Sequence, residues 1–169
     1  DDNSCVLRDG LSSIADAMRS AGGLIFAAPE YWEGIHAKAR AFWERICFMG
    51  RHGGIFPFRH LKAVSIGVSG TGDSSAGLSD LRRFMEDARI ELLDEIAVQG
   101  TYACFSCGIG EECPVSGLWD IYPRGFRPGA GAIPSLENQL PQFSSPRPDC
   151  SLENRFDRAA ERLKEALST

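Results

Sequence analysis

One short stretch constrains the fold more than any other: five apolar residues in a row, 24–28 (LIFAA), followed directly by Pro29. A wholly apolar run of this length is typical of a strand that is buried on both faces, as in a parallel sheet. A glycine pair, Gly22-Gly23, precedes the run and suits the end of a helix. Parallel strands are joined by long crossovers, usually helices, so the run predicts strands that alternate with helices.

Helix-like and strand-like patterns do alternate along the chain as far as residue 103. Apolar residues recur at helical spacing over 10–21, 35–49 and 78–88, and strands are expected over 61–68 and 96–103. We therefore predict an α/β fold, a doubly wound parallel sheet with helices on both faces. The apolar stripes predict these core residues: Leu11, Ile14, Ala15, Met18, Ile35, Ala39, Phe42, Trp43, Ile46, Leu78, Leu81, Phe84, Met85 and Ala88.

Length and composition fit one ordinary globular domain. The chain has 169 residues, of which 43% are hydrophobic and 24% charged, and we expect a single domain over 1–169. The net charge of −5, with scattered lysines and arginines, excludes a basic nucleic-acid-binding face. No apolar run approaches the ~20 residues that span a bilayer, so no membrane partner is expected. A Gly/Pro-rich segment over 108–150, either a functional cover or partly disordered, precedes an amphipathic helix over 151–168.

The first residues, 1–4 (DDNS), show neither a starting Met nor a secretory pattern. The missing Met suggests a trimmed or partial chain. Without a secretion signal, the six cysteines are expected to be reduced thiols in a cytoplasm.

Two loops follow the carboxyl ends of predicted strands, where open parallel sheets bind their ligands. The loop 29–34 (PEYWEG) offers two aromatic rings for stacking and lies at a helix N-terminus, whose N–H groups favour anionic or electron-rich partners. The loop 69–73 (SGTGD) has two glycines, which let the backbone approach a flat ligand. The candidate binding residues are Pro29, Glu30, Tyr31, Trp32, Glu33, Gly34, Ser69, Gly70, Thr71 and Gly72.

The residues around the first loop resemble a known family. The stretch 21–46 is similar to the third strand, loop and helix of flavodoxin-like NADPH-dependent FMN reductases and iron–sulfur flavoproteins. In that family the strand ends Pro-x-Tyr, and the helix carries a Lys and a terminal acidic residue followed by Arg. The matching residues here are Pro29-Glu30-Tyr31, Lys38, Glu44-Arg45 and the loop 69–72, and Cys5-Val6 with the helix that follows resembles the segment after the iron–sulfur flavoproteins' cysteine run.

The resemblance implies a flavodoxin-like domain that holds FMN between the loops 29–34 and 69–72. It implies an NAD(P)H-dependent FMN or quinone reductase, which transfers hydride from NAD(P)H through the flavin to an acceptor, and a homodimer. In the family a first strand and a Ser/Gly/Asn/Thr-rich loop hold the FMN phosphate, and nothing before Cys5 matches them. We therefore expect a domain truncated at its N-terminus.

Three cysteines, Cys104, Cys107 and Cys113, form a C-x2-C-x5-C run beside glycines. Thiolates at this spacing can meet one zinc ion or the iron of an iron–sulfur cluster. A fourth ligand is not obvious, so cysteines without a cofactor are the simpler interpretation. This run is not the motif of the iron–sulfur flavoproteins, in which the cluster cysteines precede the Cys5 position.

Each candidate in the first loop also has a purely structural interpretation. Tyr31 and Trp32 can cover the core beneath the loop instead of stacking on a flavin. Glu30 and Glu33 can simply favour a helix start, where a carboxylate gains about 0.3–1 kcal/mol from the helix dipole. His36 is more often a solvated or core-edge histidine than a catalyst.

The sequence leaves three functions open. The favoured one is a flavin-dependent oxidoreductase of the NAD(P)H:FMN or quinone reductase type. The alternative is a flavodoxin-like or iron–sulfur electron-transfer protein without its own substrate. The third is a partial module used for assembly, in which an uncovered apolar sheet edge self-associates.

Overall fold

The computed structural model describes residues 4–51, 54–70, 73–100 and 151–168. The predicted Gly/Pro-rich segment over 108–150 lies outside the described residues. Within them the chain forms helices and strands in alternation, in the order that the apolar patterns predicted. The elements are α1 (Leu11–Ser20), β1 (Gly23–Pro29), α2 (Ala37–Arg51), β2 (Lys62–Ser69), α3 (Ser75–Asp87), β3 (Glu91–Gln99) and α6 (Ser151–Leu167).

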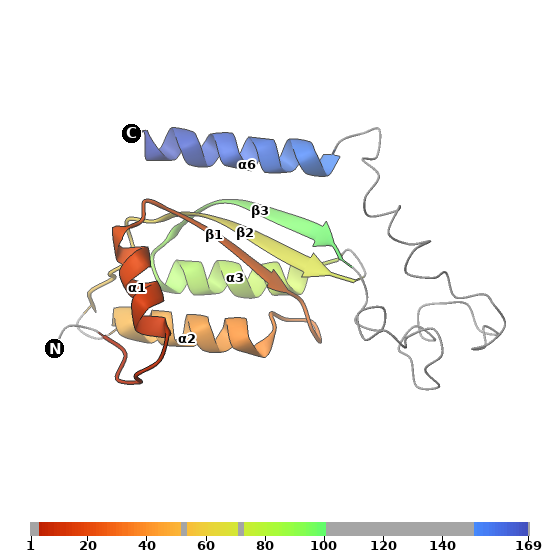
Figure 1. Ribbon diagram of the computed structural model, residues 1–169. Coiled ribbons are helices and arrows are strands. Elements are labelled where there is room, and N and C mark those ends of the chain that lie inside the picture. Colours follow the sequence, from red (N-terminus) through yellow and green to blue (C-terminus); the bar gives the residue numbers. More distant parts are fainter. Residues whose placement is uncertain (1–3, 52–53, 71–72, 101–150, 169) are drawn as a thin grey trace, which may run out of the picture.

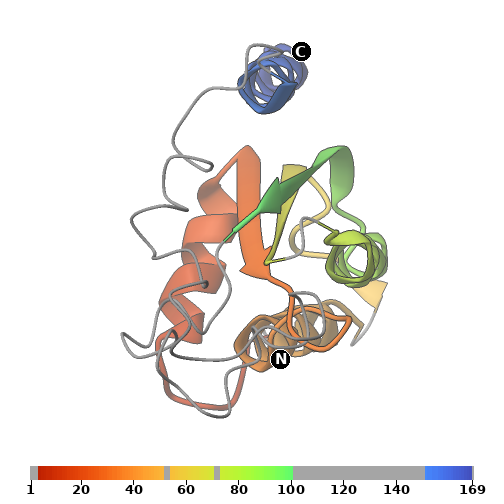
Figure 2. The same cartoon turned by 90° about the vertical axis from the view of Figure 1, so that its right-hand side faces the viewer.

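The three strands form one parallel sheet in the order β1-β2-β3. The crossover helices α2 and α3 lie on one face of the sheet, and α6 lies on the other (Figures 1 and 2). The prediction of an α/β fold with a parallel sheet and helices on both faces is confirmed. Three consecutive strands in consecutive order are consistent with the last three strands of the flavodoxin-like order 2-1-3-4-5, and equally with those of the order 3-2-1-4-5-6.

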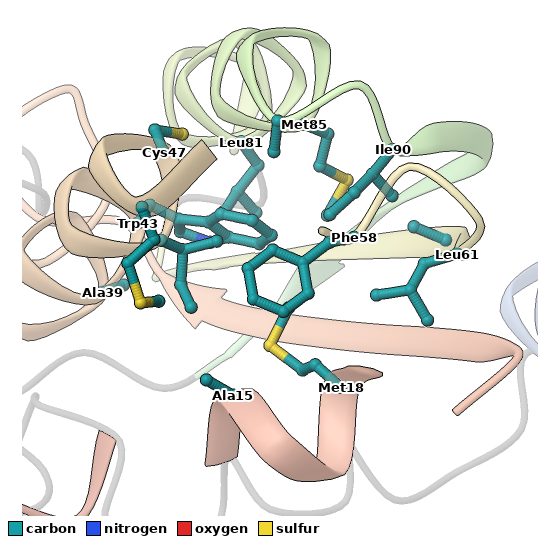
Figure 3. Close-up of a cluster of buried hydrophobic side chains, with 14 of the residues drawn as sticks. Ala15, Met18, Ala39, Trp43, Cys47, Phe58, Leu61, Leu81, Met85 and Ile90 are labelled. Atoms are coloured by element: carbon teal, nitrogen blue, oxygen red, sulfur yellow. The ribbon is translucent and has the colours of Figure 1, made fainter. Parts of the chain in front are cut away.

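The main core fills the space between the sheet and the helices α1, α2 and α3. The indole of Trp43 is completely buried at its centre, and Met18 from α1 reaches toward the ring of Phe58 (Figure 3). Trp43 contacts Phe26 of β1 edge to face, with ring centroids 5.1 Å apart, and stacks on Phe84 of α3 at 6.3 Å. The fully buried large side chains of this cluster are Trp43, Ile46, Phe58, Leu61, Leu81 and Met85.

Helix α1 confirms three of its four predicted core residues. Leu11, Ala15 and Met18 are buried, whereas Ile14 is 48% exposed. The buried positions are spaced i, i+4 and i+7, which is one narrow face of a helix. Ile14 lies beside that face, because α1 packs against the core along one side only.

The opposite face of the sheet has a much smaller core under α6. It consists of Val64, Ile96 and Ala159, with Ile66 and Val98 partly buried against them. Polar contacts add to the attachment of α6: Arg155 Nη2 donates to the Glu95 carbonyl oxygen at 3.2 Å, and Arg162 pairs with Asp94 at 3.2 Å.

The prediction that 24–28 is buried on both faces is wrong for one face. Phe26 and Ala28 point into the main core, but Ile25 is 64% exposed and Ala27 is also exposed. Both exposed side chains are on the face that α6 covers. At the start of β1, a Cβ atom on Gly23 would lie 3.3 Å from Leu163 and from Leu167 of α6.

The third strand begins five residues earlier than the predicted 96–103 and ends at Gln99. A register shift between Ala63 and Val64 leaves Leu93 opposite no residue of β2, which is a β-bulge. Residues an even number of positions apart normally lie on the same face of a strand. Because of the bulge, Leu92 instead packs in the main core and Ile96 packs on the α6 face. The alternation that identifies a strand is therefore broken, and the charges of Glu91, Asp94 and Glu95 disguise it further.

In the described part of the chain, none of the helices has the length and apolar character needed to cross a lipid bilayer.

Candidate functional site

The loops after β1 and β2 leave the sheet at the same edge. Pro29 pairs with Val68 at the last step of the ladder, and the amide of Glu30 donates to the Val68 carbonyl oxygen at 2.8 Å. Ser69 is the next residue of β2 and its last. The predicted loops 29–34 and 69–72 therefore start side by side at the carboxyl edge of the sheet, as parallel strands require.

The first loop is a tight turn that presents Trp32 to solvent. The Tyr31 amide donates to the Gly34 carbonyl oxygen at 2.9 Å, and Glu30 forms an antiparallel bridge with Ile35. The two central residues, Trp32 and Glu33, have φ of 54° and 57°, the left-handed values of a type I′ turn. That conformation costs roughly 1–2 kcal/mol for each residue that is not glycine.

The aromatic residues of this turn are not core residues. Trp32 is fully exposed and Tyr31 is 58% exposed; the Tyr31 ring lies nearly perpendicular to the His36 ring, with 6.3 Å between the centroids. The structural interpretation, in which Tyr31 and Trp32 cover the core, is wrong for Trp32. A bulky residue in a strained conformation, with its side chain in water, is a recognised feature of binding sites.

Two carboxylates, Glu30 in the turn and Asp80 in α3, connect the turn to helix α3. Glu30 Oε2 accepts a hydrogen bond from the Gly77 amide at 2.7 Å, in the first turn of α3. Asp80 Oδ2 accepts from the Ile35 amide at 3.2 Å and from Arg40 Nη2 at 2.5 Å. One residue of α3 thus binds the turn and α2 together, and the turn is anchored at both ends.

Glu30 does favour a helix start, but of a different helix from the predicted one. The sequence places Glu30 just before α2, whereas its carboxylate caps α3, 47 residues further along the chain. A carboxylate in that position satisfies an amide that has no partner within the helix and interacts favourably with the helix dipole. Glu33 lies at the exposed tip of the turn.

Two glycines allow α3 to come this close. A Cβ atom on Gly77 would lie 3.1 Å from Glu30 Oε2, and one on Gly67 of β2 would lie 2.9 Å from Leu78 Cγ and from Ser74 Cβ. The buried hydroxyl of Ser74 donates to the Gly67 carbonyl oxygen at 3.0 Å. The start of α3 therefore rests directly on the backbone of the central strand.

The second loop is described only in part. Ser69 is buried, Gly70 is half-buried, and the Ser69 carbonyl oxygen accepts from the Gly100 amide at 2.9 Å. The predicted site residues Thr71 and Gly72 lie outside the described residues. After the gap, Asp73 Oδ1 accepts from the Ser75 amide at 3.0 Å, and this bond holds the pKa of the Asp73 carboxyl below its usual value.

The turn offers a set of backbone donors beside its aromatic rings. Within the ranges that the structure describes, the amides of Trp32, Glu33 and Gly34 have no acceptor. Such donors can bind the polar edge of a flat ligand whose face stacks on an aromatic ring. A planar heterocycle with carbonyl and ring-nitrogen acceptors fits this arrangement.

The cysteines fall into two groups. Cys104, Cys107 and Cys113 lie outside the described residues, so the predicted metal or cluster site has no structural counterpart here. Among residues 4–51, 54–70, 73–100 and 151–168, no three His, Cys, Asp or Glu side chains are placed to hold a metal ion.

Cys5 lies next to Arg45 of α2. Arg45 Nη2 donates to Cys5 Sγ at 3.0 Å, and Arg45 also forms an ion pair with Asp9 at 2.8 Å. The bond from Arg45, followed by one from the Leu7 backbone, lowers the pKa of the Cys5 thiol. Arg45, which belongs to the predicted family motif, therefore fixes the N-terminal segment instead of lining the loops.

A shallow depression of about 520 Å³ lies between α3 and the outer edge of β3. Its lining includes Arg82 and Glu86 from α3 and Leu93 and Glu95 from β3. Arg82 and Glu95 form an ion pair across it. This depression contains none of the predicted site residues.

Sequence reasoning missed Asp80 and Gly77, the two α3 residues that position the first loop. No local signal marks them, because each acts on a partner more than forty residues away in the chain. Asp80 looks like an ordinary solvated residue of an amphipathic helix.

The fold defines a protein of the α/β class, with a parallel sheet whose strand order is consistent with a flavodoxin-like fold and with a candidate site at the carboxyl edge of that sheet. Among solved structures, the chain is similar to one titled "The Structure of Trp Repressor Binding Protein from Bacillus subtilis", with 21% sequence identity and a TM-score of 0.47. The match covers 57% of this chain and 61% of that one, so this chain spans less than two thirds of that protein. No protein-family profile and no curated protein matches the sequence.

Proposed function

We propose that this chain binds a flavin, FMN, at the carboxyl edge of its sheet and acts as an NAD(P)H-dependent oxidoreductase of the FMN or quinone reductase type. The observation that carries the proposal is the turn Pro29–Gly34, which holds a fully exposed indole in a strained conformation beside three amides that have no acceptor in the described part of the chain. The resemblance of the stretch 21–46 to flavin reductases supports the same ligand.

The residues of the turn suit the isoalloxazine ring. Trp32 and Tyr31 would bind a face of the ring, and the amides of Trp32, Glu33 and Gly34 would donate to its carbonyl and nitrogen edge. Asp80 and Glu30 would hold the rings and amides of the turn in position, because both form hydrogen bonds that connect the turn to α3. When bound, FMN supplies hydride acceptance and donation, so the protein needs to bind, orient and partly desolvate the reactants.

The phosphate of FMN needs a different part of the protein. Glu30 already occupies the Gly77 amide at the start of α3, and its negative charge opposes a phosphate there. The first two amides of α2, those of Ala37 and Lys38, have no acceptor among the described residues, and a helix N-terminus binds anions.

Flavin binding is tested by titrating the full chain with FMN and following absorbance and flavin fluorescence. The variant Trp32→Gly removes the ring but keeps the turn, since glycine adopts a φ of 54° without strain. We expect it to weaken FMN binding about fivefold, which corresponds to about 1 kcal/mol of lost stacking. The control is Phe48→Ala, which removes an exposed aromatic side chain from α2.

Three outcomes decide the proposal. A wild-type chain that ignores FMN overturns it. Equal affinities of wild type and Trp32→Gly move the ligand away from the turn. Bound iron and acid-labile sulfide, lost on Cys104→Ser or Cys107→Ser, with slow NAD(P)H oxidation, would favour the electron-transfer alternative instead.

A further inference from the structure

The ion pair between Arg40 and Asp80 lies directly against the last residue of the turn, Gly34. A Cβ atom on Gly34 would lie 3.0 Å from Asp80 Oδ2 and 3.7 Å from Arg40 Nη2. The lack of a side chain at this position therefore allows the ion pair to approach the turn. The Gly34 amide is one of the three that have no acceptor in the described part of the chain. Both charges thus lie beside a donor of the proposed ligand site.

The Asp80 carboxylate is poorly solvated. Its side chain is 15% exposed, and its Oδ2 atom accepts both from the Ile35 amide and from Arg40 Nη2. A charge in such a place is screened less than a charge in water, so it acts more strongly on its neighbours. Without a compensating cation, Asp80 would oppose negative charge on a ligand at the turn.

Arg40 occupies a position that its own helix does not favour. It is the fourth residue of α2, and the first turn of this helix contains no acidic residue. The N-terminal end of a helix dipole is positive and disfavours a cation. The arginine is therefore explained by its ion-pair partner Asp80 and not by the formation of α2.

The guanidinium of Arg40 is held on two sides. Its central carbon lies 5.7 Å from the centroid of the Phe84 ring, and its Nη2 atom pairs with Asp80 at 2.5 Å. Phe84 in turn stacks on the buried ring of Trp43. An exposed ion pair usually contributes little, because two long side chains lose entropy to hold one geometry. Here a packed ring and a short carboxylate side chain fix the position of the cation.

We propose that Arg40 compensates the charge of Asp80, so that the carboxylate which positions the turn does not oppose reduction of the bound flavin. The inference rests on the proposed binding of FMN at the turn. A hydride that leaves NAD(P)H, which becomes NAD(P)⁺, carries two electrons and one proton and adds one negative charge to the ring. A carboxylate beside the ring destabilises that charge, and an adjacent guanidinium cancels the effect.

A purely structural role for the ion pair makes a different prediction. If Arg40 and Asp80 only hold the turn, removal of either partner weakens flavin binding in both oxidation states. If the pair sets the local charge, removal of one partner lowers the reduction potential and removal of the other raises it. The sign of the two shifts therefore separates the roles.

The test measures the reduction potential of FMN bound to the full chain, by spectroscopic titration against a reference dye. Arg40→Gln leaves Asp80 uncompensated and should lower the ratio of reduced to oxidised bound flavin about tenfold, a shift of about −30 mV for a two-electron couple. Asp80→Asn removes the negative charge but keeps an oxygen that can accept from the Ile35 amide, and should raise the potential by a similar amount. The double variant should return close to the wild-type potential.

Two control variants separate local charge from other effects. Arg40→Lys keeps the positive charge and should retain most of the wild-type potential. Arg82→Gln removes one positive charge from another ion pair of α3, with Glu95, outside the candidate site, and should leave the potential unchanged. Hydrogen exchange of the Ile35 amide without FMN checks that the turn keeps its anchor in Asp80→Asn.

The outcomes distinguish this inference from the proposed function. A wild-type chain that does not bind FMN overturns both. Bound FMN whose potential shifts in the same direction in Arg40→Gln and Asp80→Asn, or in neither, overturns the inference alone. So does loss of FMN binding by either variant, which would mean that the pair only holds the turn. A shift in Arg82→Gln as large as that in Arg40→Gln would also overturn it, because net charge would then set the potential.

Discussion

The two faces of the sheet are packed very differently. On the α2 and α3 face, a cluster of completely buried side chains surrounds Trp43, and glycines allow α3 to rest on the strand backbone. On the α6 face the buried hydrophobic residues among those that the structure describes are Val64, Ile96 and Ala159, and Phe156 of α6 is 38% exposed. The tightly packed face is also the one that positions the candidate site, because α3 anchors the turn Pro29–Gly34. The face with the larger core is therefore also the one whose helix contacts the candidate site.

The largest expected effect tests the difference in packing directly. Trp43→Ala should lower the free energy of unfolding by about 3–5 kcal/mol, because it leaves a large cavity among side chains that cannot collapse into it. Phe156→Ala on the other face should cost less than about 1 kcal/mol, since that ring is already partly in water. Urea denaturation of both variants measures the contrast. Equal losses would mean that α6 covers its face as tightly as α2 and α3 cover theirs.

A smaller effect tests the close approach of α3. Gly67→Ala should destabilise the protein by about 1–3 kcal/mol, because the added methyl group would lie 2.9 Å from Leu78 and Ser74. Gly50→Ala is the control: its added methyl group meets only ordinary contacts of 3.6 Å and longer, and alanine favours a helix. The control should be neutral or slightly stabilising. A harmless Gly67→Ala would show that α3 can move away from the sheet without cost.

The third variant is expected to increase the free energy of unfolding instead of lowering it. Trp32→Gly should raise the free energy of unfolding by up to about 1 kcal/mol, since glycine relieves a left-handed conformation at an exposed site. The gain is limited because glycine also increases the entropy of the unfolded chain. Thermal unfolding compared with that of Trp32→Asn, which tolerates the same conformation, measures it. A loss of stability would mean that the indole makes contacts in the folded state.

The smallest expected effect is a shift in the pH at which the Cys5 thiol reacts. Because Arg45 lowers the pKa of Cys5, its thiolate persists to lower pH than that of an ordinary cysteine. Alkylation of Cys5 by iodoacetamide should therefore be half-maximal at a lower pH than in the Arg45→Gln variant, as followed by peptide mass spectrometry. Buried Cys47 provides an internal control that should react slowly in both proteins. Identical pH profiles for Cys5 would contradict the contact with Arg45.

The sequence predicted the elements with regular patterns and missed the irregular ones. The apolar run 24–28 and the helical stripes identified β1, α2 and α3 to within a few residues. β3 was placed too late, because its bulge at Leu93 breaks the alternation of apolar and polar residues. The exposure of Ile25 was also missed, because a run of apolar residues does not tell which of its faces another element will cover.

For the candidate site, the sequence identified the loops but not what holds them. The position of Pro29–Gly34 and Ser69–Gly70 at one edge follows from parallel strands, and the structure places them there. The binding of a flavin by these loops remains a prediction. The roles of Asp80 and Gly77 could not be predicted, because each depends on where α3 comes to rest.

By itself, the sequence determined the alternation of strands and helices, and hence a parallel sheet whose loops meet at one edge. Local periodicity and turn residues suffice for that, since they act over a few neighbouring positions. Only the tertiary structure decided that Glu30 caps α3, that Asp80 anchors the turn, and that Trp32 faces solvent. Those outcomes depend on contacts between residues far apart in the chain, which form only when the helices pack on the sheet.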